Sequence, residues 1–218
     1  MVSSATLAVS GYRDEAVPNT FLRQDGATDH LAILLPGINY SCDLPLLYYP
    51  ARVLVARGAD VLRVEYAYNR RPDYAALSSA GQAEWLYADT AAACRAGLAQ
   101  RAYRQVTLVG KSLGTLAMGH LLTAEPDLAG ARAVWLTPLL RLDHLRAQIA
   151  RWSGPSLFAI GTADPYYDAA ALAEVQAATK GLAVVVADAD HGMEIAGDVV
   201  RSLQAMIEVI QALEQFLA

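Results

Sequence analysis

The most informative residues in the chain are a serine with a glycine two positions away on either side. The stretch reads Gly110-Lys111-Ser112-Leu113-Gly114 and follows an apolar run at 106–109. A strand before this motif and a helix after it would place the serine hydroxyl on a sharp turn above the strand end, the arrangement called a nucleophile elbow. The glycines leave room for crossing backbone, and the helix N-terminus favours developing negative charge. The pattern predicts that Ser112 is a nucleophile.

Two other interpretations of the serine motif compete. Gly-Lys-Ser could be the tail of a phosphate-binding loop, but that motif needs glycine where Gln105 stands, and the predicted strand occupies the loop. Alternatively, the glycines only cap a strand-to-helix junction, since a five-residue pattern is common by chance. The motif alone leaves this second interpretation open, so partner residues must decide.

A serine nucleophile needs a base, and the chain has four histidines. His30 opens a predicted strand, His120 lies inside the helix after the serine, and His144 lies in a variable segment. His191 instead follows a predicted strand across a short acidic loop and precedes the final helix. Loops at the carboxyl ends of strands carry functional groups in open α/β sheets. His191 is therefore the predicted base.

An acid that orients the histidine is also expected. Asp164 follows the predicted strand 156–160 and precedes a proline. A carboxylate there would hold the imidazole in the tautomer that accepts the serine proton. The alternative is a turn residue, because Asp-Pro commonly starts turns. Three other aspartates remain alternatives for the acid, although Asp168 suits the N-cap of the next helix and Asp188 and Asp190 suit solvated positions.

Short apolar runs alternate with longer amphipathic stretches, which is typical of an α/β fold with a mostly parallel sheet covered by helices on both faces. Strands are predicted at 5–9, 17–22, 31–35, 60–65, 106–109, 131–136, 156–160 and 182–186. Helices are predicted at 44–57, 80–101, 113–124, 139–151, 168–179 and 195–217. The first two strands form a meander, and 66–79 is predicted to be a long loop.

The composition excludes several classes of protein. The 218 residues are 55% hydrophobic and 18% charged, which excludes intrinsic disorder. Cys42 and Cys94 are too few for a disulfide framework or a cysteine-rich metal site. A net charge of −5 without a basic stripe disfavours a nucleic-acid partner. The N-terminus shows no secretory pattern and no apolar run approaches about 18 residues, so we expect a cytoplasmic protein without a membrane partner.

Taken in chain order, these motifs resemble the α/β-hydrolase superfamily, in particular its small single-domain members similar to dienelactone hydrolases and carboxylesterases. The resemblance covers roughly residues 5–217. It implies an α/β-hydrolase fold of about eight strands in one domain, 1–218, with a minimal cap or none. In this superfamily the nucleophile, the acid and the histidine follow one another in that order. The resemblance therefore implies a triad of Ser112, Asp164 and His191, with no metal and no organic cofactor.

The resemblance also implies an oxyanion hole made of two backbone N–H groups. One would come from the loop after the predicted strand 31–35, where Ile38 is the expected donor and Asn39 the alternative. The other would be the N–H of Leu113, directly after the nucleophile.

The sequence departs from this family pattern in two ways. Pro36-Gly37 stands in the oxyanion loop where many members have His-Gly, and dienelactone hydrolases proper have a cysteine where this chain has Ser112. Epoxide hydrolases and haloalkane dehalogenases have an aspartate at that position, so an alkyl-enzyme mechanism is disfavoured.

Three further features concern the surroundings of the site. Lys111 is expected to form a salt bridge with a neighbouring element or to contact an anionic group. The segment 137–153 is the only candidate for a minimal lid. Two or three tyrosines are expected to touch substrate, out of a set that follows predicted strands or opens the first helix: Tyr40, Tyr48, Tyr49, Tyr66, Tyr68, Tyr166 and Tyr167.

Together these residues predict a serine hydrolase that cleaves an ester, thioester or related acyl substrate through an acyl-enzyme at Ser112. The expected partner is a small-molecule acyl substrate. A homodimer is left open, because the amphipathic final helix offers a surface for one. Two alternatives remain: a non-catalytic ligand-binding protein on the same scaffold, and an acyltransferase that uses the same triad.

Overall fold

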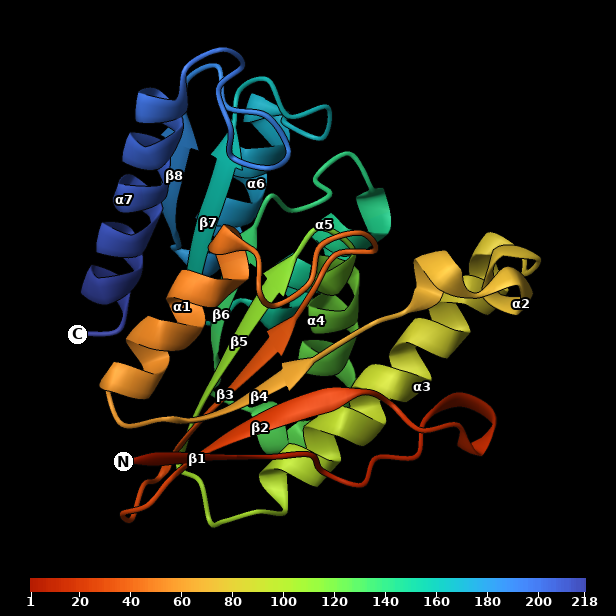
Figure 1. The fold of residues 1–218 in the computed structure, drawn as a ribbon. Helices are drawn as coiled ribbons and strands as arrows, with labels where there is room; N and C mark the ends of the chain where they lie inside the picture. The colour runs from red at the N-terminus through yellow and green to blue at the C-terminus, as the bar shows by residue number, and fades with distance from the viewer.

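Strands and helices alternate along the chain as the sequence predicts (Figure 1). The computed structural model describes residues 1–218. The strands are β1 (Val2–Ala5), β2 (Asn19–Gln24), β3 (His30–Leu35), β4 (Asp60–Val64), β5 (Gln105–Lys111), β6 (Arg132–Leu136), β7 (Ser156–Gly161) and β8 (Leu182–Val186). The helices are α1 (Pro45–Ala56), α2 (Pro72–Ala75), α3 (Ser79–Leu98), α4 (Leu113–Ala124), α5 (Asp143–Trp152), α6 (Ala169–Thr179) and α7 (Val199–Phe216).

All eight strands belong to one sheet with the order β1-β2-β4-β3-β5-β6-β7-β8. β1 pairs with β2, and β2 with β4, in antiparallel fashion; every other neighbouring pair is parallel. The carboxyl ends of the parallel strands therefore meet at one edge, which lies towards the top of Figure 1. β3 and β5, adjacent in the middle of the sheet, carry the loops where the nucleophile and the oxyanion hole are predicted.

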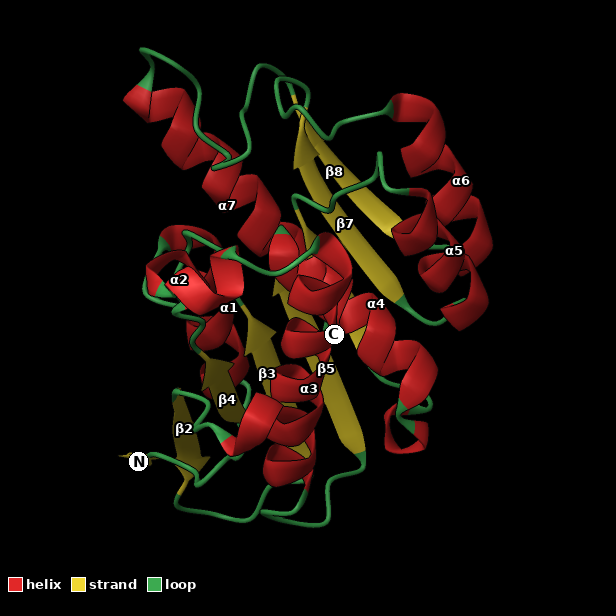
Figure 2. Ribbon diagram, turned by 90° about the vertical axis from the view of Figure 1, so that its right-hand side faces the viewer, coloured by secondary structure: helices red, strands yellow, loops and turns green.

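Helices cover both faces of the sheet, as Figures 1 and 2 show. α1 and α7 lie side by side on one face, and α3, α4, α5 and α6 cover the other. Each face has its own apolar core, and alternate residues of the central strands contribute to the two. In β3, for example, Leu31, Ile33 and Leu35 face one core, and Ala32 and Leu34 face the other. This double burial explains why the strands read as continuous apolar runs rather than alternating ones.

The N-terminal strands are the least accurate part of the sequence prediction. The predicted strands 5–9 and 17–22 are shifted, and the observed β1 and β2 pair in a register that sets Ser4 opposite Leu22. The antiparallel meander itself is confirmed. The shift arises because the Asn19 side chain replaces ladder bonds: its amide nitrogen donates to the carbonyls of Leu7 and Val17, and its oxygen accepts the Leu7 N–H.

The predicted helix bounds mostly hold within a few residues. The exceptions are 139–151 and 195–217, because α5 and α7 each begin four residues later than predicted. Turns at 140–141 and 196–197 precede the two helices, and Ile195 forms an isolated bridge with Ala189. The predicted loop 66–79 contains a 3-10 turn at Tyr68–Arg70 and the short helix α2. None of the helices is long and apolar enough to cross a lipid bilayer.

Candidate active site

Ser112 occupies the turn between β5 and α4, in a backbone conformation that side-chain-bearing residues rarely adopt, with φ 51° and ψ −115°. The neighbouring glycines explain how the turn fits. A Cβ on Gly110 would lie 2.7 Å from the carbonyl oxygen of Gly114, and a Cβ on Gly114 would overlap the carbonyl oxygen of Leu35. The sequence motif therefore forms the strand-turn-helix that it predicts, with Ser112 at the carboxyl edge of the sheet.

His191 reaches the serine from the loop between β8 and α7. Its Nε2 atom lies 2.8 Å from Ser112 Oγ, and its side chain is 28% exposed, so the pair is open to a substrate. The loop is held by the Asp190 carboxylate, which accepts the backbone N–H groups of Gly192 and Glu194. Asp190 thus organises the loop that carries the histidine.

Asp164 lies behind the histidine, in the loop after β7. Its Oδ2 atom lies 2.7 Å from His191 Nδ1, and Oδ1 accepts the Tyr166 N–H at 2.8 Å. The carboxylate has no exposed surface, whereas the imidazole is partly open to solvent. A buried carboxylate at Nδ1 leaves Nε2 as the nitrogen that can take a proton from Ser112.

The loops that carry the acid and the histidine are bound to each other. The N–H of Thr162 donates to Val186 O, and that of Ala163 to Ala189 O. The hydroxyl of Thr162 accepts the N–H of Asp188 at 2.9 Å. A Cβ on Gly161 would overlap the Ala189 carbonyl, so only glycine allows this approach.

The turn after β3 lies beside Ser112. A Cβ on Gly37 would lie 3.3 Å from Ser112 Cβ and 3.2 Å from Tyr40 Cβ. The Tyr40 N–H donates to Gly37 O, and the Ile38 N–H between them has no acceptor within the protein. Leu113 is the first residue of α4, so its N–H has no intrahelical acceptor. Both N–H groups predicted for the oxyanion hole are thus unengaged.

Lys111 does not form the salt bridge that the sequence suggests. Its side chain is buried, and its Nζ atom lies 4.6 Å from the centre of the Tyr40 ring. The Tyr40 hydroxyl in turn accepts the N–H of Leu46 in α1. Burial raises the pKa of Tyr40 to about 12, so its phenol keeps its proton.

A pocket of about 340 Å³ adjoins the turn Gly37–Tyr40, which we call the oxyanion turn because the oxyanion hole is predicted there. Its walls are the loop after β3 and the segment after β4, including Ile38, Asn39, Tyr66, Asn69 and Arg70. A larger hollow of about 580 Å³ is lined by residues between 6 and 18, none of which belongs to this site.

The predicted tyrosines divide into three groups. Tyr40 and Tyr66 line the pocket, and the Tyr166 ring centre lies 5.5 Å from that of His191. Tyr68 is buried and donates to Asp89. Tyr48 and Tyr49 are exposed on α1, and the Tyr167 backbone N–H donates to Asp164 O at 2.9 Å.

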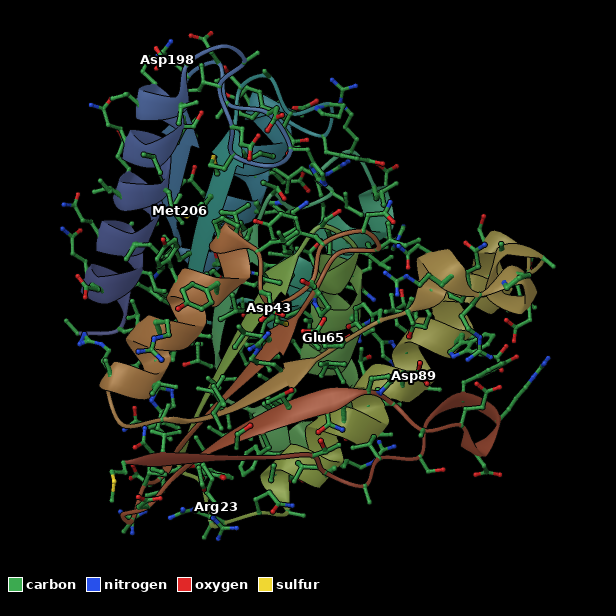
Figure 3. The ribbon with its side chains drawn as sticks, viewed as in Figure 1. Arg23, Asp43, Glu65, Asp89, Asp198 and Met206 are labelled. Atoms are coloured by element: carbon green, nitrogen blue, oxygen red, sulfur yellow. The ribbon has the colours of Figure 1, made fainter.

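Glu65 is a residue near the site that the sequence did not single out. It follows β4, and its carboxylate accepts the N–H of Cys42 at 3.1 Å. Burial raises the pKa of Glu65. Figure 3 shows Glu65 and Asp43 close together beside the loop between β3 and α1, where Arg63 also pairs with both. A carboxylate at the carboxyl end of a predicted strand was the signal that could have identified it.

The other three histidines lie outside the candidate site, and a structural or surface role was expected for His30 and His120. His30 Nε2 lies 2.9 Å from Thr107 Oγ1. His120 stacks on Tyr87 with ring centres 4.0 Å apart, and His144 is exposed on α5. Asp168 is the N-cap of α6, where its side chain accepts the Ala171 N–H.

The segment 137–153 does not act as a lid in this structure. Most of it is α5, which packs between α4 and α6 on one face of the sheet. Leu139 and Leu140, which precede α5, are buried in the core. Their burial fixes the segment against the body of the protein.

Comparison with known proteins gives the same architecture. A family model described as "Alpha/beta hydrolase domain" matches residues 37–218, and no curated protein matches the sequence. An esterase from Pyrococcus furiosus aligns with a TM-score of 0.69 and 13% identity, covering 100% of this chain and 92% of its own. A Xanthomonas campestris serine hydrolase without a lid aligns with a TM-score of 0.67 and 21% identity, covering 99% of this chain and 94% of its own. A dienelactone hydrolase from Anabaena variabilis aligns with a TM-score of 0.67 and 19% identity, covering 99% of this chain and 97% of its own.

The solved structures show a shared fold, and the family model extends over most of the chain, from Gly37 to Ala218. The elbow, the loop order and the eight-stranded sheet described above agree with that match. The chain belongs to the alpha/beta hydrolase domain family.

Proposed function

We propose that the protein is a serine hydrolase that cleaves an ester, thioester or related acyl substrate through an acyl-enzyme at Ser112. The observation that carries the proposal is the continuous chain of contacts from Ser112 Oγ through His191 to Asp164, at 2.8 and 2.7 Å. Family membership and the likeness to solved esterase structures support hydrolysis as the reaction class.

The mechanism uses groups of this chain alone. His191 Nε2 takes the proton of Ser112 as the oxygen attacks the substrate carbonyl. The Asp164 carboxylate keeps the imidazole in the correct tautomer and stabilises the imidazolium. The N–H groups of Ile38 and Leu113 would donate to the oxyanion, and removal of one such donor typically lowers the rate by about 100-fold or more.

The tetrahedral intermediate then collapses forward, and the bond between the carbonyl carbon and the leaving group breaks. The imidazolium gives its proton to the departing alkoxide or thiolate, and Ser112 keeps the acyl group. Water then attacks the acyl-enzyme while His191 removes its proton, and collapse releases the carboxylic acid and restores the serine hydroxyl.

The test uses purified protein with short-chain p-nitrophenyl esters and a fluorophosphonate probe. We expect release of p-nitrophenol and stoichiometric labelling of Ser112, located by mass spectrometry, and loss of both in Ser112→Ala. A folded protein that is neither labelled nor active would reject the proposal and favour a ligand-binding protein.

Product analysis separates hydrolysis from acyl transfer. The reaction is run with and without an added alcohol or thiol acceptor. Free acid as the main product in both cases supports the hydrolase, whereas a transferred acyl group as the main product would identify an acyltransferase.

A further inference from the structure

Lys111 is a buried cation without an anionic partner, inside the nucleophile elbow. The residue is 4% exposed, no carboxylate oxygen lies within 4.0 Å of Nζ, and the side chain makes no hydrogen bond. Other partly buried cations are paired: Arg63 with Asp43, and Arg101 with Asp60. An unpaired buried ammonium destabilises a fold, so the position of Lys111 needs another explanation.

The Lys111 side chain runs against the oxyanion turn. Its Cδ atom would lie 3.4 Å from a Cβ on Gly37, and its ammonium lies 4.6 Å from the centre of the Tyr40 ring. Tyr40 closes the turn that contains the Ile38 N–H, and its hydroxyl is held by the Leu46 N–H at 2.9 Å. A desolvated cation on an aromatic face is strongly attracted to it. The ammonium therefore holds the ring of the residue that closes the turn.

The charges around Lys111 come from three loops. Asp164 follows β7 and Asp190 follows β8, and both carboxylates attract the ammonium from beyond contact distance. The Glu194 carboxylate, in the loop that carries His191, repels a phenolate at Tyr40 and so contributes to its raised pKa. Burial outweighs these attractions and lowers the pKa of Lys111 to about 8. The side chain is therefore charged at pH 7 and becomes neutral above about pH 8.

We propose that Lys111 is a positioning residue whose ammonium, through the Tyr40 ring, fixes the oxyanion turn with the Ile38 N–H aimed above Ser112. The inference rests on the proposed hydrolase function and adds a requirement for charge one residue before the nucleophile. Lys111 does not touch the reacting atoms in this role. It acts on the transition state, where the oxyanion forms, so its loss should lower kcat more than it changes KM.

The test compares Lys111→Met, Tyr40→Leu and the double variant. Lys180→Met is the matched control, because Lys180 is the only other lysine and is exposed at the end of α6. We expect kcat to fall about 30-fold in Lys111→Met with KM within about twofold, a similar fall in Tyr40→Leu, and no further fall in the double variant. Lys180→Met should match the wild type. Lys111→Gln provides a second neutral side chain if the methionine variant does not fold.

The pH profile supplies a readout that a merely structural role would not affect. In the wild type, kcat should decline as pH rises through about 8, where Lys111 loses its proton. Lys111→Met should lack this decline. Fluorophosphonate labelling of Ser112 at wild-type stoichiometry shows that the variant retains its nucleophile.

The inference is overturned if Lys111→Met keeps the wild-type kcat and pH profile, or if the losses in the double variant multiply. These results differ from a failure of the proposed function, in which the wild type itself shows no turnover that depends on Ser112. In that event, ¹⁵N relaxation of the amides at 37–40 tests the positioning role without turnover. Order parameters that fall in Lys111→Met support the role, and unchanged order parameters reject it.

Discussion

His191 Nδ1 lies 2.7 Å from Asp164 Oδ2, although 27 residues separate the two along the chain. The carboxylate is buried and accepts only one other hydrogen bond, from the Tyr166 N–H. An amide in its place could hold the ring but would favour the tautomer that cannot accept the serine proton.

Asp164→Asn should therefore lower kcat by about 10⁴-fold. Single-turnover kinetics with a p-nitrophenyl ester and the rate of fluorophosphonate labelling measure this loss. Asp168→Asn is the control, because asparagine caps a helix as well as aspartate does and Asp168 caps α6. A loss in Asp164→Asn no greater than in the control would contradict the role of Asp164.

The backbone of Ser112 should reveal its strain when the side chain is removed. At φ 51° and ψ −115°, any side chain costs about 1–3 kcal/mol that glycine does not. We expect Ser112→Gly to be more stable than Ser112→Ala, by urea unfolding. At Ser79, the first residue of α3, the order should be reversed, because glycine is the poorer helix former. The same order at both sites would show that the elbow is unstrained.

Gly114→Ala should disrupt the contact between α4 and β3. The added methyl group would overlap the Leu35 carbonyl oxygen, which is backbone and cannot rotate away. We expect the free energy of unfolding to fall by about 3 kcal/mol or more, measured by urea titration. Gly26→Ala is the control, since nothing lies within 4 Å of its added Cβ and its backbone is unstrained. Equal stability of the two variants would show that the backbone of Leu35 does not require glycine at position 114.

Lys111→Met should make the protein more stable at neutral pH. Burial lowers the pKa of Lys111 from 10.5 to about 8, which corresponds to a cost of about 3 kcal/mol while the side chain is charged. Below pH 8 the lysine is protonated in both the folded and unfolded states, so the full cost is present. Between pH 8 and 10.5 the unfolded chain binds more protons, so wild-type stability rises with pH relative to the variant.

The measurement is urea unfolding of both proteins at pH 7 and pH 10. The free energy of unfolding of the variant should exceed that of the wild type by about 1–3 kcal/mol at pH 7. This difference should be smaller at pH 10. A variant less stable than the wild type at pH 7, or a stability difference that does not change with pH, would show that burial of the ammonium is not the dominant effect.

The sequence predicts the central sheet and the three facing side chains well, because both depend on local patterns. The run at 182–186 and the helix 113–124 have the same bounds in the structure. Both are continuous apolar runs next to residues that interrupt regular structure, with Gly181 before β8 and Pro126 after α4. Ser112, Asp164 and His191 each follow a strand of a parallel sheet, whose carboxyl ends must meet at one edge.

What the sequence does not predict depends on contacts between distant segments. The shifted N-terminal strands result from Asn19, whose side chain bonds to backbone 12 residues away. Lys111 was expected to meet an acid, but the nearest partner is an aromatic ring brought in by another loop. Neither contact follows from spacing along the chain.

The mutual binding of the two loops after β7 and β8 divides the site into two halves of different character. Hydrogen bonds join the loops that carry Asp164 and His191 into one half of the site, while the wall beside the turn after β3 comes from the segment after β4. Under the proposed function, remodelling Tyr66 to Arg70 would therefore change the wall that a substrate meets without touching the residues proposed to transfer protons.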